Sequence, residues 1–199
     1  IFVGLFLSVS ALSVNAQTLP EVQSLMKQGQ MQQALEKVDG YISTKPKDAQ
    51  GRFMQGLILT ELGRSADAIA VFTKLTEDFP ELPEPYNNLA VLYAQQKHYD
   101  KARTALEMAI RTHPSYSIAH ENLGDVYAKL ASQAYDKALQ LDSSNAATQT
   151  KLSMIKDLIS TTKPSKPGAA APQPAAETAK PVAIQPAVSA PPAAKPAEK

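Results

Sequence analysis

Cysteine is absent from this sequence of 199 residues. The chain therefore cannot form a disulfide, has no thiol nucleophile and cannot carry a lipid on an N-terminal cysteine. It also has no glycine-rich phosphate-binding loop, and its three histidines lack the spacing of zinc ligands. The net charge is only +1, and basic and aromatic residues do not cluster in the predicted folded part. We therefore predict no catalytic residue, no cofactor, no metal and no nucleic-acid partner.

Three series of residues recur at an interval of 34 residues. They are Pro46, Pro80 and Pro114; Gly56, Ala90 and Gly124; and Ala34, Ala68 and Ala102. A period of this length indicates one supersecondary unit that is used several times. Such units stack into an extended surface and do not close around an active-site pocket, which favours the binding of a partner.

Each unit has the pattern of two helices. Apolar residues such as Leu89, Leu92 and Tyr93 lie at helical spacing, so each predicted helix has one apolar stripe. Gly29 and Gly63 fall in the turns between helices, where a positive φ has little steric cost for glycine. A proline then follows the second helix of each pair and prevents its continuation.

The third unit, from Pro83 to Pro114, agrees with the pattern of the tetratricopeptide repeat at many positions. These positions are Tyr86, Leu89, Ala90, Tyr93, Tyr99, Ala102, Leu106, Ala109 and Pro114. The second unit has Gly56, Leu59, Gly63, Ala68, Phe72 and Pro80 at the equivalent places. The chain resembles this family over residues 19–161, in its exported bacterial form. The resemblance implies an all-α fold, a short right-handed solenoid of about four helix pairs within a domain over residues 17–162. The repeats are expected at 17–46, 49–80, 83–114 and 117–142, with a C-terminal capping helix at 145–161.

The fourth unit departs from the period. Leu123 and Ala138 are 15 residues apart, whereas their counterparts Leu89 and Ala109 are 20 residues apart. The five missing residues are those that would form the turn between the two helices. Between Val126 and Leu141 there is no Gly or Pro. One apolar stripe instead continues through Leu123, Tyr127, Leu130, Ala134, Ala138 and Leu141. We predict that the fourth pair is shortened and fused into one long helix over residues 117–141, before the capping helix.

The N-terminal residues 1–16 have the pattern of a secretory signal. Residues 1–14 are almost wholly apolar, and small residues follow at Val14-Asn15-Ala16, where a signal peptidase would cleave. The apolar stretch is short for a membrane span. We therefore expect a truncated signal peptide, a mature chain from Gln17 that is not stably inserted in the membrane, and a periplasmic or secreted location. An uncleaved anchor helix is the alternative.

Residues 163–199 differ sharply in composition from the rest of the chain. They hold nine of the 15 prolines, together with 12 alanines, five lysines and two glutamates, so their net charge is +3. Residues 17–162 have 15 basic and 17 acidic residues and a net charge of −2. Such a tail cannot form a core and is expected to be disordered. It would act as a spacer in the cell wall, make a weak contact with an anionic polymer, or serve as a passive solubilising tail.

In tetratricopeptide proteins the first helix of each pair lines a concave groove. The resemblance places nine residues in a peptide-binding groove here: Phe53, Met54, Leu57, Asn87, Asn88, Val91, Glu121, Asn122 and Asp125. The amides of Asn88 and Asn122, one repeat apart, are expected to pair with the backbone of an extended peptide, or else to hold neighbouring helices together. Phe53, Met54 and Leu57 are expected to form an apolar floor. Glu121 and Asp125 would favour a neutral or basic segment.

These features together predict a non-catalytic adaptor. It would bind a peptide or helix of another protein of the bacterial envelope in its groove. The alternative is a structural module that forms homo-oligomers through the helices of the fourth repeat and the cap.

Overall fold

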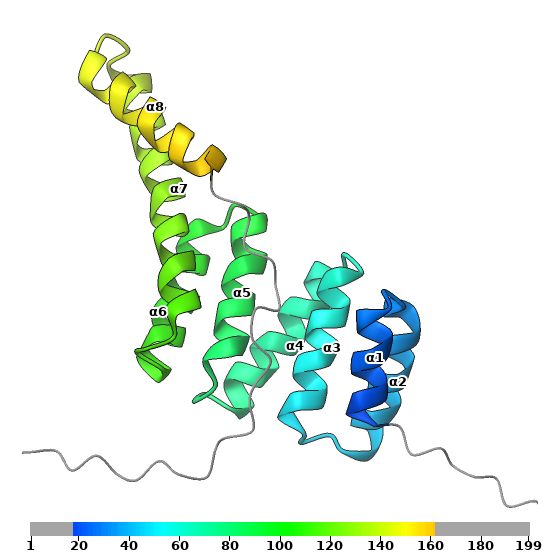
Figure 1. Cartoon of the computed structure of the whole chain (residues 1–199). Helices are drawn as coiled ribbons and strands as arrows, with labels where there is room; N and C mark the ends of the chain where they lie inside the picture. The colour runs from blue at the N-terminus through cyan, green and yellow to red at the C-terminus, as the bar shows by residue number, and fades with distance from the viewer. Residues whose placement is uncertain (1–17, 162–199) are drawn as a thin grey trace, which may run out of the picture.

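The computed structural model describes residues 18–161, and these residues form eight α-helices and no strand (Figure 1). The helices are α1 (Leu19–Lys27), α2 (Met31–Thr44), α3 (Ala49–Glu61), α4 (Ser65–Asp78), α5 (Pro83–Gln95), α6 (Tyr99–Thr112), α7 (Ser117–Leu141) and α8 (Ala146–Thr161). None of the helices within residues 18–161 is long and apolar enough to cross a membrane. The predicted signal peptide (1–16) and the predicted disordered tail (163–199) lie outside the described residues.

The helices form a linear array of antiparallel pairs, α1–α2, α3–α4 and α5–α6, which stack side by side (Figure 1). The second helix of each pair packs against the first helix of the next pair, so α2 contacts α3, α4 contacts α5, and α6 contacts α7. One apolar core runs through the array from Leu19 to Val126. The predicted all-α solenoid is therefore confirmed.

Within a pair, close approach of the two helices depends on a small residue in the first helix. A Cβ atom added at Gly56 would lie 2.6 Å from the Cζ atom of Phe72 in α4. The Phe72 ring is fully buried and packs edge-to-face on Phe53, with ring centroids 5.6 Å apart. The aromatic ring of α4 therefore occupies the space that a larger side chain at Gly56 would need.

The turns inside the first three pairs share one backbone conformation. Gly29, Gly63 and Lys97 are 34 residues apart, and their φ angles are +74°, +72° and +61°. Glycine adopts this left-handed region without steric cost, whereas a residue with a Cβ atom is disfavoured by roughly 1–2 kcal/mol. The turn geometry is thus kept in the third pair, where the sequence pattern lacks its glycine.

Helix α7 is a single helix of 25 residues, with no reversal of the chain inside it. Its C-terminal half extends beyond α5 and α6, and α8 runs back along this half (Figure 1). Leu152 of α8 is buried, and the Lys156 ammonium lies 3.2 Å from the Asp136 carboxylate of α7. The predicted fusion of the fourth pair into one long helix, followed by a capping helix, is confirmed.

Candidate binding groove

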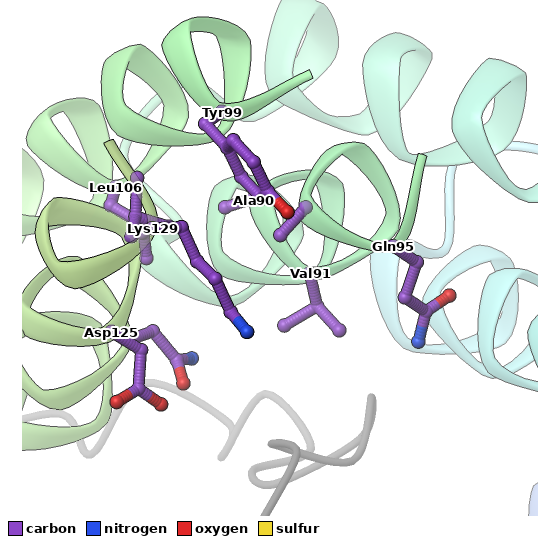
Figure 2. Close-up of a pocket in the computed structure, with 10 residues that line it drawn as sticks. Ala90, Val91, Gln95, Tyr99, Leu106, Asp125 and Lys129 are labelled. Atoms are coloured by element: carbon purple, nitrogen blue, oxygen red, sulfur yellow. The ribbon is translucent and has the colours of Figure 1, made fainter. Parts of the chain in front are cut away.

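A pocket of about 200 Å³ opens between α5 and α7, with α6 behind it (Figure 2). It is lined by Ala90, Val91, Ala94, Gln95, Tyr99, Leu106, Asn122, Asp125, Val126 and Lys129. Figure 2 shows Asp125 and Lys129 on one side and Val91 and Gln95 on the other. The walls are therefore the first helices of two successive repeats, as expected for the groove of a solenoid.

The repeat period explains which residues face each other across the pocket. Val91 and Asp125 hold the same position in successive repeats, and so do Gln95 and Lys129. Because stacked repeats have the same orientation, equivalent positions of neighbouring first helices project into one shared space. Tyr99 and Leu106, from the second helix of the third pair, close the back of this space.

The chemistry of the pocket is apolar inside and polar at its edge. Alanine, valine and leucine side chains form most of the wall, while Gln95, Asp125 and Lys129 supply amide, carboxylate and ammonium groups. Pockets that hold cofactors or drug-sized ligands usually have volumes of about 300–1,000 Å³. A space of about 200 Å³ is suited to one or two side chains of a bound polypeptide.

A buried amide pair connects the two walls beneath the pocket. The Asn122 Nδ2 atom donates a hydrogen bond to the Asn87 Oδ1 atom at 2.7 Å, and these residues are only 6% and 2% exposed. Buried amides are costly unless they are hydrogen-bonded, so this contact stabilises the packing of α5 against α7. The pair of Asn87 and Asn122 agrees with the alternative expectation for asparagine, which was that its amide holds neighbouring helices together.

Asn88 is also buried, at 1% exposed, and its Nδ2 atom donates to the Glu84 backbone carbonyl at 2.9 Å. The prediction that Asn88 and Asn122 present stacked amides to a peptide backbone is therefore wrong for Asn88. Asn122 does line the pocket, but its amide donates to Asn87 and not to Asn88, which holds the equivalent position in the preceding repeat.

The expected apolar floor is also wrong in part. Phe53 and Met54 are 0% and 3% exposed and belong to the core, while Leu57 is half-buried. The position of Phe53 in its helix corresponds to Asn87 one repeat later, and both face the neighbouring helices. Of the predicted groove residues, the structure brings Val91, Asn122 and Asp125 together in the pocket, whereas Glu121 is exposed outside its lining.

Asp125 is the one acidic residue in the lining of this pocket. Its partial burial raises its pKa above the usual value, and the nearby charge of Glu121 acts in the same direction, while Lys129 opposes both. The charged carboxylate is thus incompletely solvated and would gain from a donor or cation supplied by a ligand.

The nine predicted groove residues do not include seven others that line the pocket: Ala90, Ala94, Gln95, Tyr99, Leu106, Val126 and Lys129. The resemblance implies a groove wall made of first helices, and Tyr99 and Leu106 belong to α6, the second helix of the third pair. Lys129 could have been found, since it lies one repeat after Gln95 in the same register.

A stack of helix pairs with a pocket between successive first helices defines a helical-repeat protein, a class whose general role is to bind other proteins. Two sequence models described as tetratricopeptide repeat match residues 19–83 and 59–124. The matches together span residues 19–124, which is more than half of the chain. The chain belongs to the tetratricopeptide repeat family, whose members generally mediate protein–protein interactions.

Parts of this chain are similar to known proteins. The tetratricopeptide repeat domain-containing chloroplast protein PYG7 of Arabidopsis thaliana is 33% identical over 87 residues, which are 41% of this chain and 29% of PYG7. The chain thus spans less than a third of that relative. The MamA fragment (41-end) from Desulfovibrio magneticus RS-1 has a TM-score of 0.53 and 22% identity, covering 71% of this chain and 85% of that one. YrrB, described as a tetratricopeptide repeat protein with an unusual peptide-binding site, has a TM-score of 0.48 and 27% identity, covering 50% and 52%.

Proposed function

We propose that this chain is a non-catalytic adaptor of the bacterial envelope that binds a peptide or helix of a partner protein. The bound segment would lie along the groove and place one apolar side chain in the pocket between α5 and α7. The observation that carries this proposal is the pocket itself, since it is open, mostly apolar and formed by the first helices of two repeats.

The size and lining of the pocket support an anchoring role. Ala90, Val91, Ala94 and Val126 would surround an aliphatic side chain of the partner. Burial of apolar surface contributes roughly 25 cal/mol per Å², so one fully buried Leu or Ile would contribute about 1.5–3 kcal/mol. A single anchor of this kind gives a modest affinity, to which contacts along the rest of the groove would add.

The charges at the edge of the pocket support a preference for the flanking residues. Asp125 lies in the pocket wall, Glu121 is exposed one helical turn earlier, and both would attract a basic residue beside the anchor. Lys129 lies one turn further along α7 and would favour an acidic or amide group at the next contact. We infer that the bound segment is neutral or basic near Asp125.

The envelope location rests on the sequence alone. The apolar residues 1–14 and the small residues before Gln17 have the pattern of a secretory signal. These residues lie outside the described part of the chain. Fusion of the first 20 or so residues to a reporter that is active only after export would test this part of the proposal.

The binding role can be tested by filling the pocket. Ala94 is half-buried and lines the pocket, so Ala94→Phe would occupy the space that the anchor needs. Ala70 is exposed on α4, outside the pocket, and Ala70→Phe is the matched control. A random peptide library selected on the unmodified chain should yield sequences that share an apolar residue next to a lysine or arginine.

Synthetic peptides from that selection should bind the unmodified chain and the Ala70→Phe variant equally. They should bind the Ala94→Phe variant at least about tenfold more weakly, the equivalent of about 1.4 kcal/mol. Equal binding to both variants, with circular dichroism showing both folded, would exclude the pocket as the anchor site.

A further inference from the structure

Helix α7 has an open face at the position where the second and third repeats are closed. Gly124 holds the same position as Gly56, 68 residues or two repeats earlier. At Gly56 an added Cβ atom would collide with Phe72 of the paired helix, but at Gly124 it would meet no atom within 4 Å. Gly124 is exposed, and the neighbouring Tyr127 is 49% exposed. The second helix that should cover this face is missing from it.

The chain nevertheless contains the residues of that second helix. In α6 the face that covers α5 consists of Ala102, Ala105, Leu106 and Ala109, all of them buried. When the five missing residues are allowed for, their counterparts are Ala131, Ala134, Tyr135 and Ala138 in the C-terminal half of α7. Ala134 and Ala138 are exposed, and Leu141 at the end of the same half is 80% exposed. Ala131 and Tyr135 are half-buried, on the half of α7 that α8 contacts. This covering face therefore lacks the helix on which it should pack.

The two faces cannot meet within one chain. Gly124 and Tyr135 are 11 residues apart on the same continuous helix, which separates them by about 16 Å along its axis. In the second repeat the equivalent residues, Gly56 and Phe72, are in contact because a turn lies between α3 and α4. Loss of the turn leaves both halves of one interface on a single continuous helix, with Gly124, Ala134 and Ala138 exposed and Tyr135 half-buried.

We propose that two copies of this chain associate through α7, with each copy placing the C-terminal half of its α7 on the open face of the other. The two helices of a pair are antiparallel within the repeats, so the two α7 helices would be antiparallel as well. Gly124 of each copy would then face Tyr135 of the other, and both contacts form together about one two-fold axis. Such an isologous interface closes and produces a dimer.

The exposed part of the apolar stripe of α7 supports this pairing. Leu123, Tyr127, Leu130, Ala134, Ala138 and Leu141 are spaced by four, three, four, four and three residues. Tyr127, Ala134, Ala138 and Leu141 are exposed, whereas Leu123 and Leu130 pack against the core of their own chain. This spacing keeps apolar side chains on one side of a helix and is the pattern of paired helices. The small residues Gly124, Ala134 and Ala138 would allow the two helix axes to approach closely.

The dimer would leave the binding pocket accessible. Asn122 and Val126, which line the pocket, lie two residues from Gly124 and therefore about half a helical turn away from it. The pocket and the open face are thus on opposite sides of α7. The dimer and the groove are independent proposals, and each can fail without the other.

The first experiment measures the mass of the purified chain by light scattering over a wide range of concentrations. We expect a reversible monomer–dimer equilibrium. Gly124→Leu should weaken the dimer at least about tenfold, because the leucine would occupy the space needed by the second copy. It should not unfold the monomer, since the site is open and leucine favours helix. Ala70→Leu, at an exposed position of α4, is the control and should dimerise as the unmodified chain does.

The second experiment uses the absence of cysteine, which removes any background reaction. One preparation carries Gly124→Cys and another carries Tyr135→Cys, and a short bismaleimide is added to each alone and to their mixture. We expect the cross-linked dimer in the mixture, because residue 124 of one copy faces residue 135 of the other. A chain that stays monomeric at every concentration would overturn the proposal. So would a dimer unaffected by Gly124→Leu, or one that cross-links in each single preparation as well as in the mixture.

Discussion

The same substitution at two equivalent glycines should change the free energy of unfolding by different amounts. Gly56 and Gly124 share one position of the repeat and both lie inside α-helices, α3 and α7. Replacing either with alanine improves helix propensity by about 0.8–1 kcal/mol. The surroundings differ, because Gly56 faces the buried Phe72 ring and Gly124 faces open space.

The magnitude at Gly56 follows from the Phe72 contact. The new Cβ atom would lie 2.6 Å, 2.7 Å and 3.0 Å from three atoms of the Phe72 ring. The ring cannot move freely, since it is 0% exposed and packs against Phe53. Overpacking of this kind costs about 1–3 kcal/mol. The propensity gain is common to both variants, so the difference between Gly56→Ala and Gly124→Ala should be about 1–3 kcal/mol in the free energy of unfolding.

Urea unfolding followed by circular dichroism is the suitable assay, because the chain has no tryptophan to report by fluorescence. Measurements at low protein concentration limit any contribution from association of the copies. Gly124→Ala should raise the unfolding midpoint, and Gly56→Ala should lower it or leave it nearly unchanged. Equal stabilisation by both substitutions would show that α3 and α4 do not pack as closely as described, and would refute the reasoning.

Three further predictions concern other contacts. Asp48→Ala should lower the free energy of unfolding by about 1 kcal/mol in urea unfolding, because Asp48 caps α3 by accepting a hydrogen bond from the Gly51 backbone N–H at 2.7 Å. Asp48→Asn, measured by the same urea unfolding, should retain most of this stabilisation because asparagine can also cap the helix. Asn122→Ala should destabilise by about 1–3 kcal/mol in urea unfolding, because it leaves the buried Asn87 carbonyl without its donor; an unchanged midpoint would exclude that bond. Burial raises the pKa of Asp125 in the folded chain, so the fold binds this proton more tightly than the unfolded chain does. The resulting destabilisation is present above the raised pKa and is relieved as the pH falls through it. Asp125→Asn should therefore be more stable than the unmodified chain at neutral pH, and the difference in melting temperature should shrink on acidification; a difference that grows would contradict this.

Helix boundaries could be predicted from the sequence because their causes are local. Helices α2, α4 and α6 each end two residues before a proline of the 34-residue series. The fused helix could also be predicted, because its cause is local as well. A turn needs residues to form it, and the fourth unit lacks five of them.

The burial of individual groove positions could not be predicted in this way. Phe53, Asn87 and Glu121 hold one position of the period, yet the first two are buried and Glu121 is exposed. Burial at that position depends on whether another helix covers it, which is a property of the stack and not of the unit. Spacing alone also cannot show that Asn122 pairs with Asn87 and not with its repeat equivalent Asn88.

The buried bond between Asn87 and Asn122 has a consequence for the speed and cost of binding. It joins α5 to α7 through side chains, so the separation of the two pocket walls is set before any ligand arrives. A preorganised site loses little conformational entropy on association, and more of the contact energy remains as affinity. The proposed segment, with one anchor, could therefore be held by a small pocket. Its binding would need no rearrangement of the helices, so the association rate should be set by diffusion and by the ordering of the segment itself.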